Sequence, residues 1–241
     1  MEAIGTQQLE IAVGSAGPVS ALLIRPANAC ACFVFAHGAG AGMTHAAMEA
    51  TAQGLAERGV ATLRYQFPYM EKGSKRPDPP AIAHAAVRAA VAEAGRCCSG
   101  LRLIAGGRSF GGRMTSQAQA AAPLEGVVGL AFLGFPLHPA NRPSQERAKH
   151  LADVQIPMLF LQGTRDALAE LGELEPVCKA LGSLATLTLF ADADHSFHVP
   201  ARTGRKDAEV RGEMLDAMAE WIARVSSPEA AARALDTRPQ T

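Results

Sequence analysis

The chain has 241 residues, of which 48% are hydrophobic and 19% charged. This composition is typical of a folded globular protein and excludes a disordered or fibrous one. Lys and Arg number 23, as do Asp and Glu, so the formal net charge is +0, and we expect no nucleic-acid partner. No apolar stretch is long enough to predict a membrane-spanning helix, so we expect no membrane partner. The length favours one domain, residues 1–225, followed by a C-terminal tail, 226–241.

The first residues lack the basic and apolar regions of a secretory signal peptide. The 5 cysteines show no metal-like spacing, which favours free thiols in a reducing compartment. We therefore expect a cytoplasmic protein, either a monomer or a homodimer.

Apolar patterns predict strands that alternate with helices along the chain. Two strands, 9–13 and 20–25, are predicted to form an initial β-meander. The later predicted strands end at Ala36 or span residues 60–65, 101–105, 127–132, 156–163 and 185–190. The predicted helices span residues 44–58, 81–93, 114–121, 167–181 and 205–225. This alternation predicts an α/β fold, with a mostly parallel twisted sheet and helices on both faces. The short segment between strands 127–132 and 156–163 leaves no room for a large cap domain.

Five residues between strand 101–105 and helix 114–121 read Gly-x-Ser-x-Gly, from Gly107 to Gly111. A glycine-flanked serine between a strand and a helix is typical of a nucleophile elbow. The tight turn needs small neighbours, and it lifts the serine Oγ above the edge of the sheet. The helix that follows points its N-terminal N–H groups toward developing negative charge. The sequence therefore predicts Ser109 as a nucleophile.

A nucleophilic serine needs a base within hydrogen-bond reach and an acid that orients the base. Asp166 follows strand 156–163, and His195 follows strand 185–190. Ligands bind at these carboxyl ends of parallel strands. We predict that His195 is the general base and then the acid, and that Asp166 fixes its tautomer. Asp192 and Asp194 are alternatives to Asp166, but they lie so close to His195 in the chain that a turn-forming role is favoured.

The strand that ends at Ala36 runs into a glycine-rich segment, 37–42. With the elbow in place, the backbone N–H groups of Ala39 and Phe110 are predicted to form an oxyanion hole. A dinucleotide fingerprint is the rival interpretation, but the glycine spacing is Gly-x-Gly-x-Gly and Arg64, not an acid, ends the next strand. His195 and His198 form a His-x-x-His pair in a short loop, without the third, distant cluster of ligands that a metal site needs. We predict neither a metal nor a cofactor.

Arg64, Tyr65, Phe67 and Tyr69 are candidates to line the substrate pocket as an aromatic wall with one cation. The alternative is that Phe67 and Tyr69 pack under the loop while Arg64 pairs with an acid. Segments 66–80 and 137–150 are expected to rim the pocket. An uncapped site of this kind suits a small-molecule acyl substrate, namely a small or medium ester, lactone or thioester that is cleaved through an acyl-enzyme on Ser109.

The order Ser109, Asp166, His195 resembles that of the α/β-hydrolase superfamily, and the compact size is similar to that of dienelactone-hydrolase-like enzymes. Residues 106–111 (Gly-Gly-Arg-Ser-Phe-Gly) and 134–139 (Gly-Phe-Pro-Leu-His-Pro) resemble the hydrolase-like domain shared by a testis-expressed protein family and a histone-acetyltransferase-complex subunit. The resemblance implies an α/β-hydrolase fold over residues 34–222. Dienelactone hydrolases usually have a Cys nucleophile, whereas this chain has Ser109. The complex subunit implies an alternative function, a weak or inactive hydrolase-fold scaffold that binds a protein partner or small ligand.

Overall fold

The computed structural model describes residues 5–227, and eight strands in this range form one sheet in the order β1-β2-β4-β3-β5-β6-β7-β8. The strands are β1 (Thr6–Ala12), β2 (Pro18–Ile24), β3 (Ala31–Ala36), β4 (Val60–Tyr65), β5 (Arg102–Arg108), β6 (Val127–Leu133), β7 (Met158–Gly163) and β8 (Ala185–Phe190). Strands β3 to β8 run parallel to one another, whereas β2 pairs antiparallel with β4, and β1 antiparallel with β2. The predicted α/β class with a mostly parallel sheet is confirmed.

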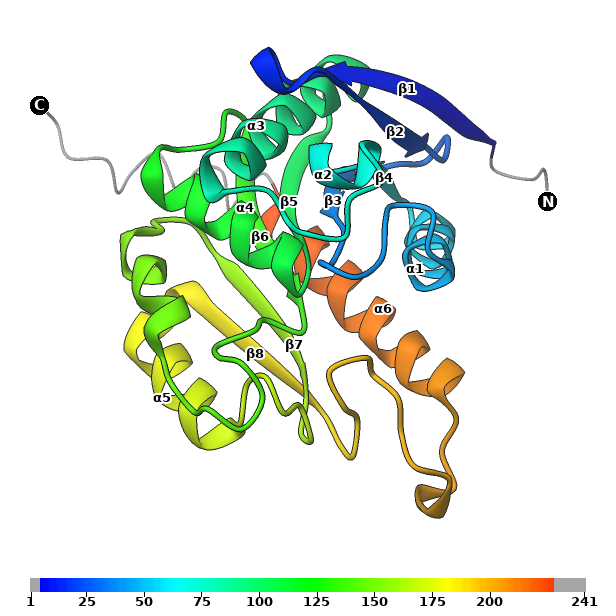
Figure 1. Cartoon of the computed structure of the whole chain (residues 1–241). Helices are drawn as coiled ribbons and strands as arrows, with labels where there is room; N and C mark the ends of the chain where they lie inside the picture. Colours follow the sequence, from blue (N-terminus) through cyan, green and yellow to red (C-terminus); the bar gives the residue numbers. More distant parts are fainter. Residues whose placement is uncertain (1–4, 228–241) are drawn as a thin grey trace, which may run out of the picture.

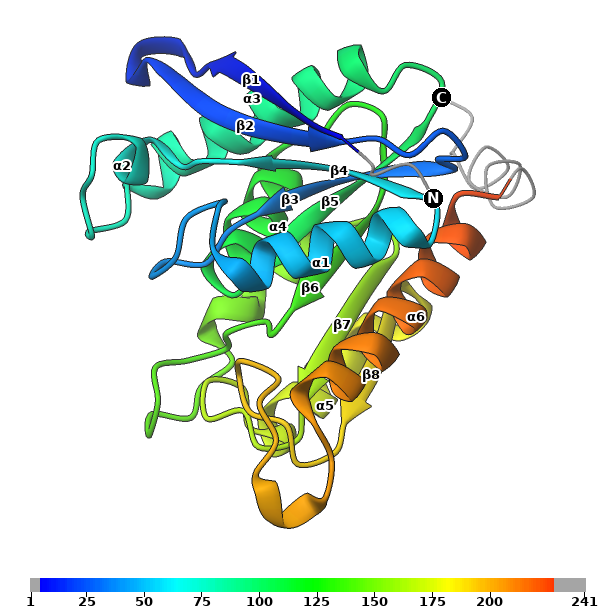
Figure 2. The same cartoon turned by 90° about the vertical axis from the view of Figure 1, so that its right-hand side faces the viewer.

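Helices cover both faces of this sheet. They are α1 (Ala46–Glu57), α2 (Pro68–Glu71), α3 (Pro80–Cys97), α4 (Phe110–Ala121), α5 (Leu171–Leu181) and α6 (Asp207–Val225). Helices α1 and α6 contact each other on one face (Figure 2), while α3, α4 and α5 lie on the other (Figure 1). The 3-10 helix η2 (Glu146–Asp153) packs against α4 and α5 on this second face.

The hydrophobic core is divided into two layers because side chains of a strand alternate between the faces of the sheet. In β3, Phe33 and Phe35 are fully buried beneath α1 and α6, while Cys32 and Val34 are buried on the α3–α4 side. A strand buried on both faces needs a continuous apolar run, as β3 has.

Several predicted element bounds differ from the structure. The helix expected from residue 167 begins at Leu171, because the Asp166 carbonyl accepts from the Ala169 N–H and forms a turn first. Strand β5 extends beyond the predicted residue 105 to Arg108, and α4 then begins at Phe110 instead of residue 114. The short helix α2 was not predicted; its first residue, Pro68, has the fixed φ that favours this position.

Two features bear on the sequence predictions for the chain as a whole. Among residues 5–227, no helix combines the length and the hydropathy needed to cross a membrane. Within the same range, the connection from β6 to β7 contains only a loop and η2, and no cap domain is inserted there. Of the predicted tail, 226–241, all but the first two residues lie outside the described part of the chain.

Candidate active site

Ser109 occupies the turn between β5 and α4, with a backbone φ of 49°. A positive φ is strained for a residue with a Cβ, and such strain is concentrated at functional sites. A Cβ at Gly107 would lie 2.3 Å from the Ala36 carbonyl oxygen, and one at Gly111 would lie 2.5 Å from the His37 carbonyl oxygen. The two glycines of the motif are therefore required because the end of β3 passes directly against the turn.

Three residues that are far apart in the sequence form a continuous hydrogen-bonded chain. His195 Nε2 lies 2.9 Å from Ser109 Oγ, and His195 Nδ1 lies 2.6 Å from Asp166 Oδ2. The Asp166 side chain is fully buried, whereas that of His195 is 22% exposed. With Nδ1–H donating to the carboxylate, Nε2 is left as the acceptor for the Ser109 hydroxyl. The structure thus brings together the three predicted residues in an arrangement that can activate the serine.

Asp166 is held by partners on both of its oxygens. The Leu168 backbone N–H donates to Oδ1 at 2.8 Å, and the Gln162 side-chain amide donates to Oδ2. Gln162, at the end of β7, also accepts the Phe135 N–H through Oε1 at 2.9 Å. The sequence reasoning missed Gln162. The signal was present, since a glutamine in an otherwise apolar buried strand needs polar partners.

The other two acids near His195 form the loop that carries it. Asp194 Oδ1 accepts the N–H groups of Ser196 at 2.7 Å and His198 at 3.0 Å. Asp192 has a φ of 58°, and its N–H donates to Thr164 Oγ1. Neither side chain contacts the imidazole by a hydrogen bond among the described residues. Their turn-forming interpretation therefore agrees with the geometry.

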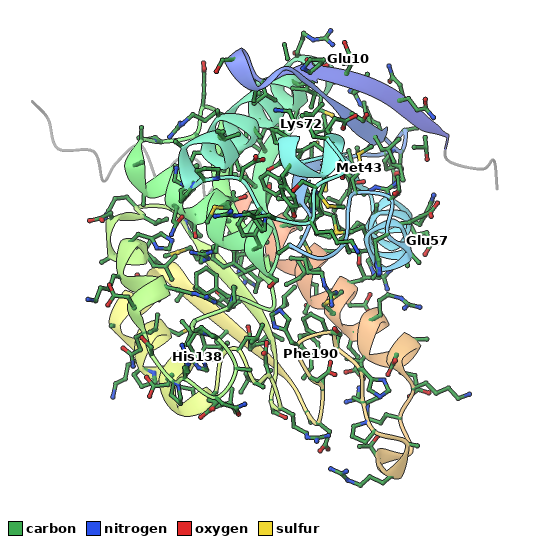
Figure 3. All side chains as sticks on the ribbon, viewed as in Figure 1. Glu10, Met43, Glu57, Lys72, His138 and Phe190 are labelled. Atoms are coloured by element: carbon green, nitrogen blue, oxygen red, sulfur yellow. The ribbon has the colours of Figure 1, made fainter. Side chains whose placement is uncertain are left out.

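The His195 loop is attached to the sheet by aromatic packing. Phe190, labelled at the end of β8 in Figure 3, packs its ring edge-on against Phe197 with 5.6 Å between centroids. Gly134 lies beneath the imidazole, where an added Cβ would be 3.2 Å from two ring atoms. The ring is therefore enclosed from behind while its Nε2 faces Ser109.

The loop that contains Ala39 is braced by two buried rings. Tyr69 Oη donates to the Ala39 carbonyl at 2.9 Å. His37 accepts the Phe67 N–H on Nε2 at 3.0 Å and donates from Nδ1 to the Gly38 carbonyl at 2.7 Å. Burial lowers the pKa of His37 to about 4, so the ring is neutral at pH 7 and holds this tautomer.

The predicted oxyanion-hole residues share a cavity with the nucleophile. A cavity of about 370 Å³ is lined by Ser109, Phe110 and Ala39 together with residues of two loops. Pro77 comes from the first predicted rim segment, 66–80, and Arg147 comes from the second, 137–150. Phe110 and Ala39 therefore lie at the same cavity as Ser109.

The predicted aromatic wall with one cation is not at this cavity, and that assignment needs correction. Arg64, Tyr65 and Phe67 are at most 2% exposed, and none of them is a cavity-lining residue. Tyr69 is equally buried and borders a neighbouring cavity instead. All four belong to β4 and the segment that follows it. Phe67 and Tyr69 pack on His37 at the start of the Ala39 loop, which is the alternative interpretation of these two residues, and Tyr65 packs on Phe67.

The Arg64 side chain has a structural partner. Its Nη1 donates to the carbonyl of Met43 at 3.2 Å, on the loop labelled in Figure 3, and no carboxylate forms an ion pair with it within residues 5–227. The Met43 N–H in turn donates to Gln66 Oε1. His45 accepts the Ala47 N–H on Nδ1 and caps α1. These bonds fix the end of the glycine-rich loop.

No group of three or more His, Cys, Asp and Glu side chains among residues 5–227 has the arrangement needed to hold a metal ion. His198 lies three residues after His195 and pairs with Asp207, with 2.9 Å between Nδ1 and Oδ2. This contact raises the pKa of His198.

The fold and site define an α/β hydrolase with a strained serine between strand and helix. Residues 29–223 match the family described as "Alpha/beta hydrolase domain", and the chain belongs to this family. Its fold is similar to that of a dienelactone hydrolase from Anabaena variabilis, at 19% identity and a TM-score of 0.74 over 91% of this chain and 97% of that one.

Two further solved structures have the same fold. An α/β serine hydrolase without lid from Xanthomonas campestris is 22% identical, with a TM-score of 0.70 over 95% of this chain and 98% of that one. An esterase domain from a Rhodothermus marinus protein is 16% identical, with a TM-score of 0.71 over 92% of this chain and 100% of that one. At these identities the likeness concerns the fold.

Proposed function

We propose that the protein is a serine hydrolase that cleaves a small or medium carboxylic ester, lactone or thioester. The observation that carries this proposal is the hydrogen-bonded chain from Ser109 through His195 to Asp166 at the edge of a cavity. Membership of the α/β-hydrolase domain family supports it. So do the names of the similar structures, a dienelactone hydrolase, a serine hydrolase and an esterase.

In the proposed reaction, Ser109 Oγ attacks the carbonyl carbon while His195 Nε2 takes the hydroxyl proton. The carbonyl oxygen becomes an oxyanion that accepts from the N–H groups of Phe110 and Ala39. The C–O or C–S bond then breaks, and His195 returns its proton to the leaving alcohol or thiol. Water attacks the acyl-enzyme by the same route in reverse, releasing the acid and restoring Ser109.

Turnover of a short-chain p-nitrophenyl ester tests the proposal. We expect burst kinetics from accumulation of an acyl-enzyme and loss of about 10⁴–10⁶ in kcat in the Ser109→Ala variant. A fluorophosphonate probe should label Ser109, as read by mass spectrometry of the labelled peptide. Ser196→Ala is the matched control, because Ser196 is exposed and lies next to His195 in the sequence.

Labelling of a different residue, or equal activity in the Ser109→Ala variant, would overturn the proposal. Absence of labelling in the folded wild-type protein, together with a stable protein partner in pull-downs, would favour the scaffold function instead.

A further inference from the structure

Two arginines line the cavity that contains Ser109. Arg113 lies on α4, four residues after the nucleophile, and Arg147 lies on η2. The Arg113 guanidinium carbon lies 5.9 Å from the ring centroid of Phe110, the residue whose N–H is assigned to the oxyanion hole. Because four residues advance a helix by about 6 Å, Arg113 begins about one turn from the reacting atom.

Neither arginine has an anionic partner in the described part of the chain. The ion pairs found among residues 5–227 involve other cations, and Arg113 Nε is buried without any hydrogen-bond partner. Burial, together with the positive charge of Arg147, lowers the pKa of Arg113. A half-buried guanidinium with a second cation nearby, and with a buried Nε that has no acceptor, is stabilised when an anion joins it.

The fold holds these like charges at the same cavity. Ser116 Oγ on α4 lies 2.7 Å from Nε2 of His150 on η2, and the His150 ring also packs on Phe135 with 6.4 Å between centroids. These contacts dock the helix of Arg147 onto the helix of Arg113. Burial and the charge of Arg113 lower the pKa of His150 to about 4, so this contact is neutral at pH 7. The backbone segments that carry the two guanidiniums are therefore held at the same cavity.

One carboxylate, that of Asp78, also lines the cavity, and it does not pair with either arginine. Its Oδ2 accepts the Tyr69 backbone N–H at 2.8 Å. On its other side it borders a second cavity that is also lined by Lys72 and Arg76. The lining of the Ser109 cavity thus has two guanidiniums and one carboxylate, and one oxygen of that carboxylate already accepts a backbone hydrogen bond.

The cavity lies on the acyl side of the reaction. Its lining includes Ser109 and both predicted oxyanion donors but not His195. The leaving group must lie next to His195 Nε2 to receive a proton. Because the His195 side chain is 22% exposed, the leaving group can depart toward solvent on that side. The acyl chain therefore extends from the carbonyl carbon into the cavity.

We propose that this site selects an acyl group that carries its own carboxylate, as in a monoester or monothioester of a short dicarboxylic acid, with Arg113 and Arg147 binding that carboxylate. Guanidiniums suit this role because their planar donors match the two oxygens of a carboxylate. The inference rests on the proposed hydrolase function and names its substrate class. The products are the free dicarboxylate and the alcohol or thiol.

Matched substrates test the inference. Ethyl hydrogen glutarate and its neutral carboxamide analogue have the same shape and differ in charge on the acyl side. We expect kcat/KM to favour the anionic ester by about tenfold or more in the wild-type protein. The preference should fall toward one in Arg113→Gln, Arg147→Gln and the double variant, and Arg113→Lys should retain part of it. Arg142→Gln removes the same charge from an exposed arginine outside the cavity, and it should keep the wild-type ratio.

A second pair of butanoyl esters places the carboxylate or the carboxamide on the alcohol instead. We expect no arginine-dependent preference within this pair. A preference seen only there would overturn the acyl-side assignment.

Binding of the glutarate dianion, measured by protection of Ser109 from a fluorophosphonate probe, separates the two hypotheses. Turnover of both glutarate-type esters without a charge preference overturns this inference and leaves the hydrolase standing. Absence of turnover with arginine-dependent glutarate binding supports the anion site and counts against the hydrolase. Absence of both turnover and glutarate binding overturns this inference, and the p-nitrophenyl ester and the labelling of Ser109 then decide on the hydrolase by themselves. If inorganic phosphate protected Ser109 more strongly than glutarate, and through the same arginines, the assignment of a carboxylate as the bound group would be overturned. Labelling rates in buffer alone check that each variant keeps a folded site.

Discussion

The carboxylate of Asp166 connects catalysis to the packing of the sheet. One oxygen is shared by His195 and Gln162, and the other is bound by the Leu168 N–H. A charged group buried in this way is tolerated only when its oxygens are satisfied. Asp166 is therefore held in place by Gln162 of β7 and by the turn that precedes α5.

We expect Asp166→Asn to lower kcat by about 10⁴, as in the comparable serine-protease triad, because the amide stabilises the wrong imidazole tautomer. Asp194→Asn retains an oxygen for the Ser196 and His198 N–H groups and should stay within a few-fold of the wild-type rate. Steady-state kinetics with the same ester measure both. An equal or greater loss in Asp194→Asn would reverse the assignment of the acid.

Gln162 is a positioning residue, and its removal should affect both stability and rate. Gln162→Leu leaves the buried Phe135 N–H without its acceptor, so we expect a loss of about 1–3 kcal/mol in the free energy of unfolding. A lower kcat at nearly constant KM should accompany it, because Asp166 loses a donor. Urea unfolding and steady-state kinetics test this. Gln155→Leu, at an exposed position before β7, is the control, and similar losses there would contradict the role of Gln162.

At the scale of elements, the site depends on how closely helices and strands approach one another. Helix α6 places Trp221 directly on Gly129 of β6, where an added Cβ would lie 2.7 Å from the ring. Trp221 is 2% exposed and belongs to the hydrophobic core. This contact attaches the last helix to the middle of the sheet, on the face opposite α4.

Two glycine substitutions should have opposite effects on the free energy of unfolding. Gly129→Ala should destabilise the fold by about 1–3 kcal/mol, because a large ring in the core must move. Gly212→Ala, within α6, meets no atom within 4 Å and should stabilise by about 0.5–1 kcal/mol through helix propensity. Thermal or urea unfolding measures each change. A neutral or stabilising Gly129→Ala would show that the contact with Trp221 does not limit packing there.

At the scale of the whole molecule, buried neutral histidines make stability depend on pH. The pKa of His37 falls from 6.5 to about 4 in the folded state because of burial. Above pH 6.5 the ring is neutral in both states. As pH falls from 6.5 to 4, the unfolded chain binds a proton that the folded chain does not bind, so the folded state loses relative stability. His150 contributes with the same sign.

We expect the His37 contribution to reduce the free energy of unfolding by about 3 kcal/mol between pH 6.5 and pH 4. His37→Gln keeps an acceptor for the Phe67 N–H but does not titrate, so its stability should fall less steeply over this range. Urea unfolding at a series of pH values measures the difference between the two curves. Parallel curves would contradict the burial of a neutral His37.

Much of the fold could be predicted from the sequence because its signals are local. The apolar runs of β4 and β8 gave bounds that match the structure, 60–65 and 185–190. The order of nucleophile, acid and histidine after successive strands predicted which side chains meet, since parallel strands end at one edge of the sheet. Boundaries around Asp166 were less accurate, because a side-chain bond to the Leu168 N–H competes with helix formation there.

The sequence by itself determined the fold class, the elbow around Ser109 and the three residues of the hydrogen-bonded chain, because periodicity and motif spacing record these directly. Only the tertiary structure decided that Arg64 and its aromatic neighbours are buried and do not line the Ser109 cavity, and that Arg113 and Arg147 reach the cavity instead. It also revealed Gln162. The face toward which a polar side chain points, and the distant segment it meets, depend on sheet order and helix docking, which no local pattern in the chain records.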